Sequence, residues 1–141
     1  MSLDIFVMTL IEDEDGRQLR FDRSVVEQAF ASFALDQETD DWQLMNPDGE
    51  IVFAMVSVDL DPTITGFSID RPPAMHTFWD AVYEVLRQTP TVVVWPGRDP
   101  SYCVAQRDYT GLVPEDYMKT FGAPVVATCG ADILAAVEAS V

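Results

Sequence analysis

Basic residues are scarce in this chain, and lysine is almost absent from it. Eight Lys and Arg side chains stand against 24 Asp and Glu, which gives 141 residues a formal charge of −16 at pH 7, and Lys119 is the single lysine. A protein this acidic repels the phosphate backbone of nucleic acids, because binding there depends on basic groups that displace counterions. It repels anionic membrane surfaces for the same electrostatic reason. We therefore expect no nucleic-acid partner and no membrane partner.

Cysteine and long apolar runs are also scarce. Cys103 and Cys129 fit neither a disulfide framework nor a metal-binding spacing, so we expect reduced thiols packed in strands. No uninterrupted apolar run approaches the ~18 residues of a membrane span. Residues 1–4 lack the basic and apolar regions of a secretory signal. These absences predict a cytoplasmic protein.

Histidine occurs once, at His76, and the residue types that carry catalysis are not grouped in the sequence. A lone histidine can act as a general base, but it needs a nucleophile and an orienting partner. The chain has no His pair, no Cys-x-x-Cys, no Asp-rich calcium loop and no Gly-rich phosphate loop. We therefore expect neither a metal nor a cofactor, and we favour a non-catalytic protein over an enzyme.

The chain does have ample apolar material for a core. Hydrophobic residues make up 48% of it, including eight Phe, three Trp and four Tyr. A domain of this length buries roughly two-thirds of the surface that its unfolded chain exposes. The sequence therefore predicts one domain over residues 1–141, with one core.

Segments rich in β-branched and aromatic residues, with turn residues between them, predict the strands. They cover residues 3–11, 42–45, 50–58, 63–70, 91–95, 101–106 and, as a strand or an extended segment, 123–128. The first and third segments are apolar on both faces, so we expect both inside a sheet rather than at its edge. Asn46-Pro47-Asp48-Gly49 predicts a hairpin turn between the second and third segments.

Apolar residues at helical spacing predict helices over Arg23–Ala34, Ala74–Gln88 and Ala131–Ala139, and a short one near residues 112–118. Ser24-Val25-Val26-Glu27 matches the capping box of a helix N-terminus. The fold class is therefore α+β, with a mostly antiparallel or mixed sheet of about five to six strands. Two to three helices are expected to pack on one face of that sheet.

Most of the acidic residues that lie outside helices and strands are grouped in three predicted loops. The candidate partner-binding residues are Glu12, Asp13, Glu14, Asp15, Asp36, Glu38, Asp40, Asp41, Asp59 and Asp61. If these loops share one end of the sheet, they form a negative rim that attracts a basic protein and accelerates its association. The alternatives are that the acids only maintain solubility, or that the surface is adapted to high salt.

Two further functions remain open on the sequence. One is a small enzyme or ligand-binding domain with a pocket between the sheet and its helices. Its candidate polar residues are Asp70, Arg71, His76, Arg98 and Asp108. The other is a structural homodimer formed through exposed strand edges and aromatic side chains.

The chain also resembles a known class of proteins, in its size, its acidity and its order of strands and helices. The segments that prompt the comparison are Gly66-Phe67-Ser68-Ile69-Asp70-Arg71-Pro72-Pro73, Phe78-Trp79 and Val94-Trp95-Pro96-Gly97. In these respects it is similar to the small acidic immunity proteins of bacterial polymorphic-toxin and contact-dependent systems. The resemblance implies a compact cytoplasmic protein without catalytic motifs that neutralises a basic partner by occluding it. It assigns no functional residue.

Overall fold

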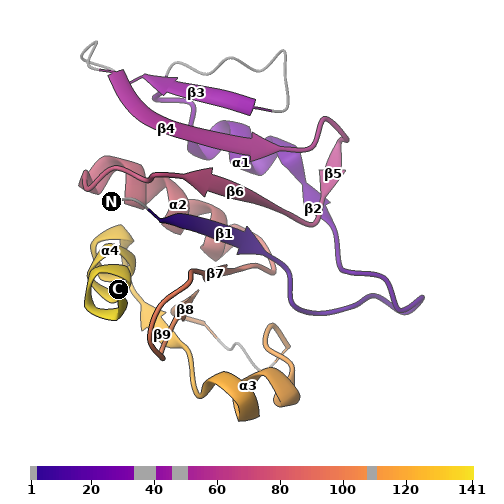
Figure 1. The fold of residues 1–141 in the computed structure, drawn as a ribbon. Helices are drawn as coiled ribbons and strands as arrows, with labels where there is room; N and C mark the ends of the chain where they lie inside the picture. The colour runs from indigo at the N-terminus through magenta and orange to yellow at the C-terminus, as the bar shows by residue number, and fades with distance from the viewer. Residues whose placement is uncertain (1–2, 34–40, 46–50, 108–110) are drawn as a thin grey trace.

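The computed structural model describes residues 3–33, 41–45, 51–107 and 111–141. Within them, a seven-stranded sheet has the strand order β3-β4-β6-β1-β7-β8-β9 (Figure 1). The strands are β1 (Asp4–Met8), β3 (Asp41–Met45), β4 (Ile51–Val58), β6 (Gly66–Asp70), β7 (Val92–Val94), β8 (Tyr102–Ala105) and β9 (Val125–Ala127). Neighbours are antiparallel except β8 and β9, which are parallel.

This architecture confirms the α+β class and the mixed sheet. The sheet has seven strands rather than five to six, because each of the seven predicted segments contributes one, including residues 123–128. The interior positions of β1 and β4 are confirmed, since β1 pairs with β6 and β7 and β4 pairs with β3 and β6. The predicted turn at residues 46–49 lies outside the described residues.

Strand β1 buries one of its faces and leaves the other partly open. Ile5 and Val7 are fully buried, whereas Phe6 between them is 43% exposed. The predicted burial of both faces is therefore wrong at Phe6, because none of the described helices covers this part of the second face (Figure 1). A strand inside a sheet can be fully hydrogen-bonded and still expose alternate side chains.

The segment 63–70 forms two strands rather than one. Thr63–Ile64 is β5, which pairs antiparallel with β2 (Phe21–Asp22) in a separate two-stranded sheet, and β6 then begins at Gly66. Phe21 lies opposite Ile64, and both are buried. This small sheet connects the segment before the first helix to the segment after β4.

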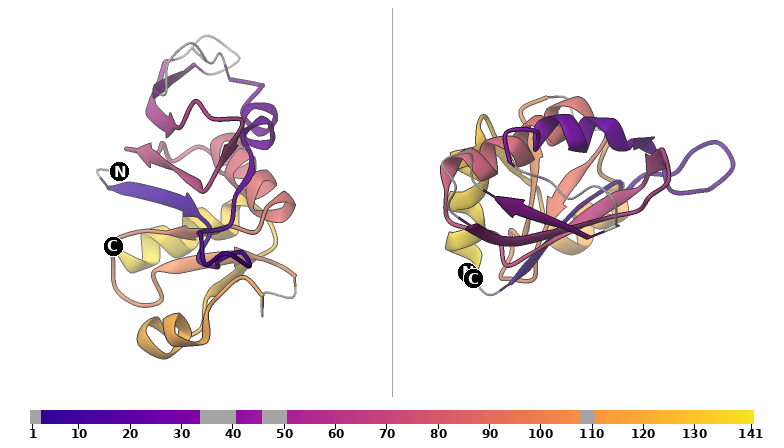
Figure 2. Two further views of the ribbon diagram at one scale, coloured as in Figure 1. Left: turned by 90° about the vertical axis from the view of Figure 1, so that its right-hand side faces the viewer. Right: turned by 90° about the horizontal axis from the view of Figure 1, so that it is seen from above.

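Three helices pack on one face of the main sheet (Figure 2), namely α1 (Arg23–Ala29), α2 (His76–Gln88) and α4 (Gly130–Ser140). The predicted stripes on the second and fourth helices are confirmed by the burial of Phe78, Trp79, Val82 and Leu86 and of Ile133, Leu134 and Val137. Helix α2 also contributes Phe78 to an aromatic cluster, in which the ring centroids of Phe30 and Phe78 lie 5.6 Å apart. Roughly 1.5–3 kcal/mol of stabilisation accompanies the burial of each large apolar side chain.

Three helices on one face agree with the two to three that were predicted, and the short helix α3 (Glu115–Phe121) packs on the opposite face. The reason is that alternate side chains of β8 point to opposite faces of the sheet. Cys103 and Ala105 face the main core, while Tyr102 and Val104 belong to a second apolar cluster with Leu112 and Val113. These side chains would be exposed to water without α3 and the loop before it.

Helix α1 begins as predicted at Arg23 but ends at Ala29, and the capping box is wrong. Asp22 is the N-cap and forms no side-chain cap, Ser24 lies inside the helix, and Glu27 pairs with Arg23. The backbone N–H of Arg23 instead donates to the carbonyl of Pro62 at 3.0 Å. This hydrogen bond to a residue far away in the sequence satisfies a backbone N–H group of the first helical turn, which a capping side chain would otherwise satisfy. The last residue of the predicted helix, Ala34, lies outside the described residues.

Candidate functional site

The acidic loops that the structure describes lie at one end of the main sheet. Strands β1 and β4 both end where β6 begins, since Met8 pairs with Gly66 and Val58 with Phe67. The loop that contains Glu12, Asp13, Glu14 and Asp15 follows β1, and the loop that contains Asp59 and Asp61 follows β4 (Figure 1). Asp41 begins β3 at this same end, opposite Ser57. Asp36, Glu38 and Asp40 lie outside the described residues.

The first of these loops is an ordered turn centred on Asp13. One carboxylate oxygen of Asp13 accepts hydrogen bonds from the backbone N–H of Asp15 at 2.9 Å and of Arg17 at 3.0 Å. Gly16 has a φ of 75°, which glycine adopts without strain. The loop therefore presents Glu12, Glu14 and Asp15 from a defined backbone.

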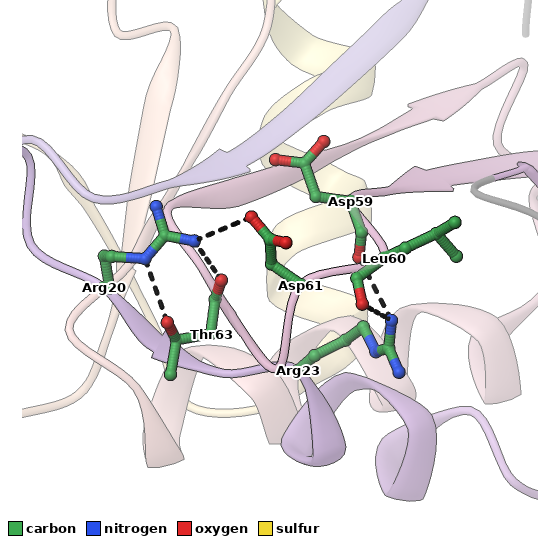
Figure 3. Close-up of polar contacts among 6 residues, drawn as sticks. All are labelled: Arg20, Arg23, Asp59, Leu60, Asp61 and Thr63. Carbon is green, nitrogen blue, oxygen red and sulfur yellow. Dashed lines mark hydrogen bonds and ion pairs between the residues drawn. The ribbon is translucent and has the colours of Figure 1, made fainter.

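The second loop is held by two arginines, Arg20 directly before β2 and Arg23 at the start of α1 (Figure 3). Arg23 donates from one guanidinium nitrogen to the backbone carbonyl of Leu60 and, at 3.4 Å, to that of Asp59. Arg20 donates to the hydroxyl of Thr63 at 2.9 Å and to the carbonyl of the same residue. Arg20 also lies 3.6 Å from the carboxylate of Asp61. The loop is therefore fixed at both of its sides.

These contacts leave Leu60 on the surface. Its side chain is 57% exposed, the highest value among the exposed large apolar side chains of the described residues. In Figure 3 it points away from both arginines. The loop thus presents an apolar side chain, flanked in the sequence by two aspartates, on a backbone that is already ordered.

The sequence interpretation identified the two acids of this loop but missed Leu60, Arg20 and Arg23. One signal was present, because a leucine between two aspartates in a turn cannot be a core residue of a strand or helix. No sequence signal marked the arginines. Their partners are backbone carbonyls about 40 residues away along the chain, as the separations of 43 and 37 residues show.

The predicted pocket residues lie at the other end of the sheet. Asp70 ends β6, Arg71 follows it with a φ of 52°, and His76 is the first residue of α2, where it is exposed. Arg98 lies in the loop between β7 and β8. Asp108 lies outside the described residues.

Of these residues, Arg98 alone among the described ones lines a groove of about 690 Å³. The groove lies between the 98–100 loop, strand β9 and helix α4, at the margin of the sheet. The groove thus contains one of the four described candidates for the predicted pocket between the sheet and its helices.

Asp70 also lies directly opposite Asp4 in the antiparallel pairing of β1 with β6. The hydrogen bond that the protonated carboxyl of Asp4 donates to the carboxylate of Asp70, together with desolvation and charge repulsion, raises the pKa of Asp4 above its usual value. Two ionised carboxylates this close repel each other, so one of them holds a proton more readily.

The cysteines offer no reactive thiol in the core. Cys103 is fully buried in β8, and burial raises the pKa of its thiol to about 12. Cys129 is exposed at the N-cap of α4, so the expectation that both thiols pack in strands is wrong for it. No three His, Cys, Asp or Glu side chains of the described residues are placed to hold a metal ion.

Within the described part of the chain, none of the helices has the length and apolar character needed to cross a membrane.

The comparisons with known proteins add no relative. The chain matches no family model, and no curated protein and no solved structure matches it.

Proposed function

We propose that this protein is a non-catalytic binding domain whose acidic sheet end engages a basic partner protein, with Leu60 as the apolar anchor. The observation that carries the proposal is the exposed Leu60 on a loop fixed by Arg20 and Arg23. We define the binding surface as residues 12–15 and 59–61.

The surface has the two properties that a protein-binding site needs. Ordering of the loop before binding reduces the entropy that association costs, because fewer backbone torsions remain to be fixed. An apolar side chain that enters a partner pocket supplies affinity, and surrounding polar groups exclude water from it. Carboxylates around the anchor attract a positive partner and repel a negative one, which sets specificity and the association rate.

The biological role in this proposal is that of an immunity-type inhibitor. The domain would occlude a basic protein in the cytoplasm rather than act on it chemically. Its resemblance to small acidic immunity proteins supports this role, as do its charge of −16 and its two unpaired cysteines, which suit a reducing compartment.

The test uses the domain as bait in an extract of the organism that encodes it. Wild type, Leu60→Ser and Leu60→Met baits are compared at equal loading, and proteins retained by the wild type are identified and purified for titration. We expect a basic protein that the wild type and Leu60→Met retain. We expect Leu60→Ser to bind it at least about tenfold more weakly, a loss of about 1.4 kcal/mol.

Two results would contradict the proposal. One is that no basic protein is retained by the wild type. The other is that a retained basic protein binds wild type and Leu60→Ser equally well, which would move the contact to another surface. Because Leu60 is exposed, its replacement should leave the fold intact, and thermal unfolding of the bait verifies this.

A further inference from the structure

The groove at the margin of the sheet is bordered by an edge strand. Strand β9 is the last in the sheet and pairs with β8 alone among the described strands (Figure 1). Its residue Val126 is 43% exposed. The groove residues come from β9, α4 and the 98–100 loop, and they are Arg98, Asp99, Pro100, Val125, Val126, Asp132, Ala135, Ala136, Ala139 and Ser140.

The backbone of β9 has room for one more strand. The N–H of Gln106 donates to the carbonyl of Ala127 at 2.8 Å, so the main-chain groups of Ala127 face β8. Because these groups alternate in direction along a strand, those of Val126 face away from β8 and toward the groove. An incoming strand could therefore exchange hydrogen bonds with Val126.

Helix α4 leaves space opposite that backbone. Between Asp132 and Ser140, which also line the groove, α4 contributes Ala135, Ala136 and Ala139, whose side chains are single methyl groups. Larger side chains there would fill the volume between helix and strand. The helix itself is anchored to the core by Ile133 and Val137, both fully buried.

The positively charged side chain of Arg98 belongs to one end of the groove. Arg98 lies near the start of β9, because its loop precedes β8 and Val125 pairs with Cys103 early in β8. Its backbone is fixed to the end of α4, since its N–H donates to the Ser140 carbonyl at 2.8 Å and its carbonyl accepts from the Ser140 hydroxyl. Within the described residues its guanidinium forms no salt bridge.

The acid groups of the groove are differently placed. The carboxylate of Asp132 accepts hydrogen bonds from the backbone and hydroxyl of Thr128 at 2.8 and 2.7 Å, and these bonds lower its pKa. Asp99 accepts a hydrogen bond from the Ser101 hydroxyl at 3.3 Å. Both acids thus have a polar partner in the fold, whereas the cation of Arg98 is available for an anion from outside.

We propose that this groove binds the carboxyl-terminal segment of another protein, in extended conformation, as a strand added antiparallel to β9. Antiparallel pairing directs the carboxyl end of the segment to the start of β9, where Arg98 pairs with the terminal carboxylate. Added strands gain affinity from main-chain hydrogen bonds, and arginine forms strong paired bonds with a carboxylate. A second copy of this chain is disfavoured as the occupant, because each copy carries a charge of −16.

The test is binding of fluorescent octapeptides of randomised sequence, prepared with a free carboxyl end and, for the selected binders, as the carboxamide. Expected are binders with a free carboxylate whose affinity falls at least about tenfold on amidation. Arg98→Gln should cause a similar loss, and Ala135→Trp should abolish binding by filling the groove. Arg17→Gln and Ala31→Trp are the matched controls, at exposed positions outside the groove, and should have no effect.

Three results would overturn the inference. They are the absence of any binder, binders that ignore both amidation and Arg98→Gln, and dimerisation by light scattering that Ala135→Trp abolishes, which would make a second copy the occupant. Leu60→Ser should not change peptide binding. Failure of this inference is therefore distinguishable from failure of the proposed function.

Discussion

Arg23 joins the start of helix α1 to the loop after β4 through its hydrogen bond to the backbone carbonyl of Leu60. The same guanidinium holds the carboxylate of Glu27 at 2.9 Å, so the arginine is oriented from its own helix. Its side chain is 26% exposed, which places these bonds partly out of water. The proposed binding surface thus depends on a residue that need not touch the partner itself.

Arg23→Ala should loosen the loop and destabilise the fold moderately. The variant loses hydrogen bonds from a charged donor to two loop carbonyls, and we expect urea unfolding to show a loss of about 1–2 kcal/mol. Amide hydrogen exchange at residues 59–61 should accelerate, while exchange in α4 should not. An unchanged exchange rate at Leu60 would show that the arginine does not order the loop.

The acids around Leu60 should govern the association rate with the partner. Asp59→Asn with Asp61→Asn removes two charges from the binding surface, and Asp116→Asn with Glu138→Gln removes two from exposed positions on α3 and α4. Stopped-flow mixing at low salt should show a slower association for the first pair only, and the difference should shrink at high salt. Equal slowing by both pairs would favour a role of net charge alone.

Asp4→Asn should stabilise the protein at neutral pH. The pKa of Asp4 is raised in the fold by Asp70, so the stabilising state is the one that holds a proton. That stability is present below the ordinary value of 3.8 and is lost as pH rises through the raised pKa. Arg71, which favours the charged form of Asp4, opposes this effect without cancelling it.

The measurement for Asp4→Asn is the melting temperature against pH. The variant should melt above the wild type at neutral pH, because asparagine is a hydrogen-bond donor without the charge. The two curves should converge as pH falls below 3.8, where Asp4 is protonated in both the folded and the unfolded chain. A constant difference at all pH values would refute electrostatic repulsion as the cause.

Gly130→Ala should separate helices α2 and α4. A Cβ atom at Gly130 would lie 2.3 Å from the backbone nitrogen of Asp80, which cannot move without its helix. We expect a cost of roughly 1–3 kcal/mol in denaturant unfolding, as for other overpacked sites. Gly111→Ala is the control, since no heavy atom lies within 4 Å of its Cβ position, and a comparable cost there would contradict the packing argument.

The sequence predicted most of the fold because strongly apolar periodic segments leave few alternatives. Helix α2 was recognisable from the spacing of Phe78, Trp79, Val82 and Leu86, and each of the seven strands lies in a segment with β-rich composition. The two-residue strand β2, and the division of the predicted strand 63–70 into β5 and β6, could not be predicted, since two residues carry no period. The face of the sheet that α3 covers could not be predicted either, because it depends on which side chains of β8 point to each face.

The site was predicted less well than the fold. The acids at residues 12–15, 59 and 61 were identified from composition, and the described ones do share one sheet end. The exposed position of Leu60 depends on the hydrogen bond that Arg23 donates to the Leu60 backbone carbonyl. This bond is possible because the pairing of β2 with β5 brings residues 23 and 60 together. Long-range pairing of this kind leaves no local pattern in a sequence.

The most direct test of the proposed function is hydrogen exchange of the domain with and without its captured partner. Amides of residues 12–15 and 59–61 should exchange more slowly in the complex, while those of β9 and the 98–100 loop should keep their rates. Protection confined to other parts of the chain, with residues 59–61 unchanged, would contradict the assignment of the acidic sheet end as the binding surface.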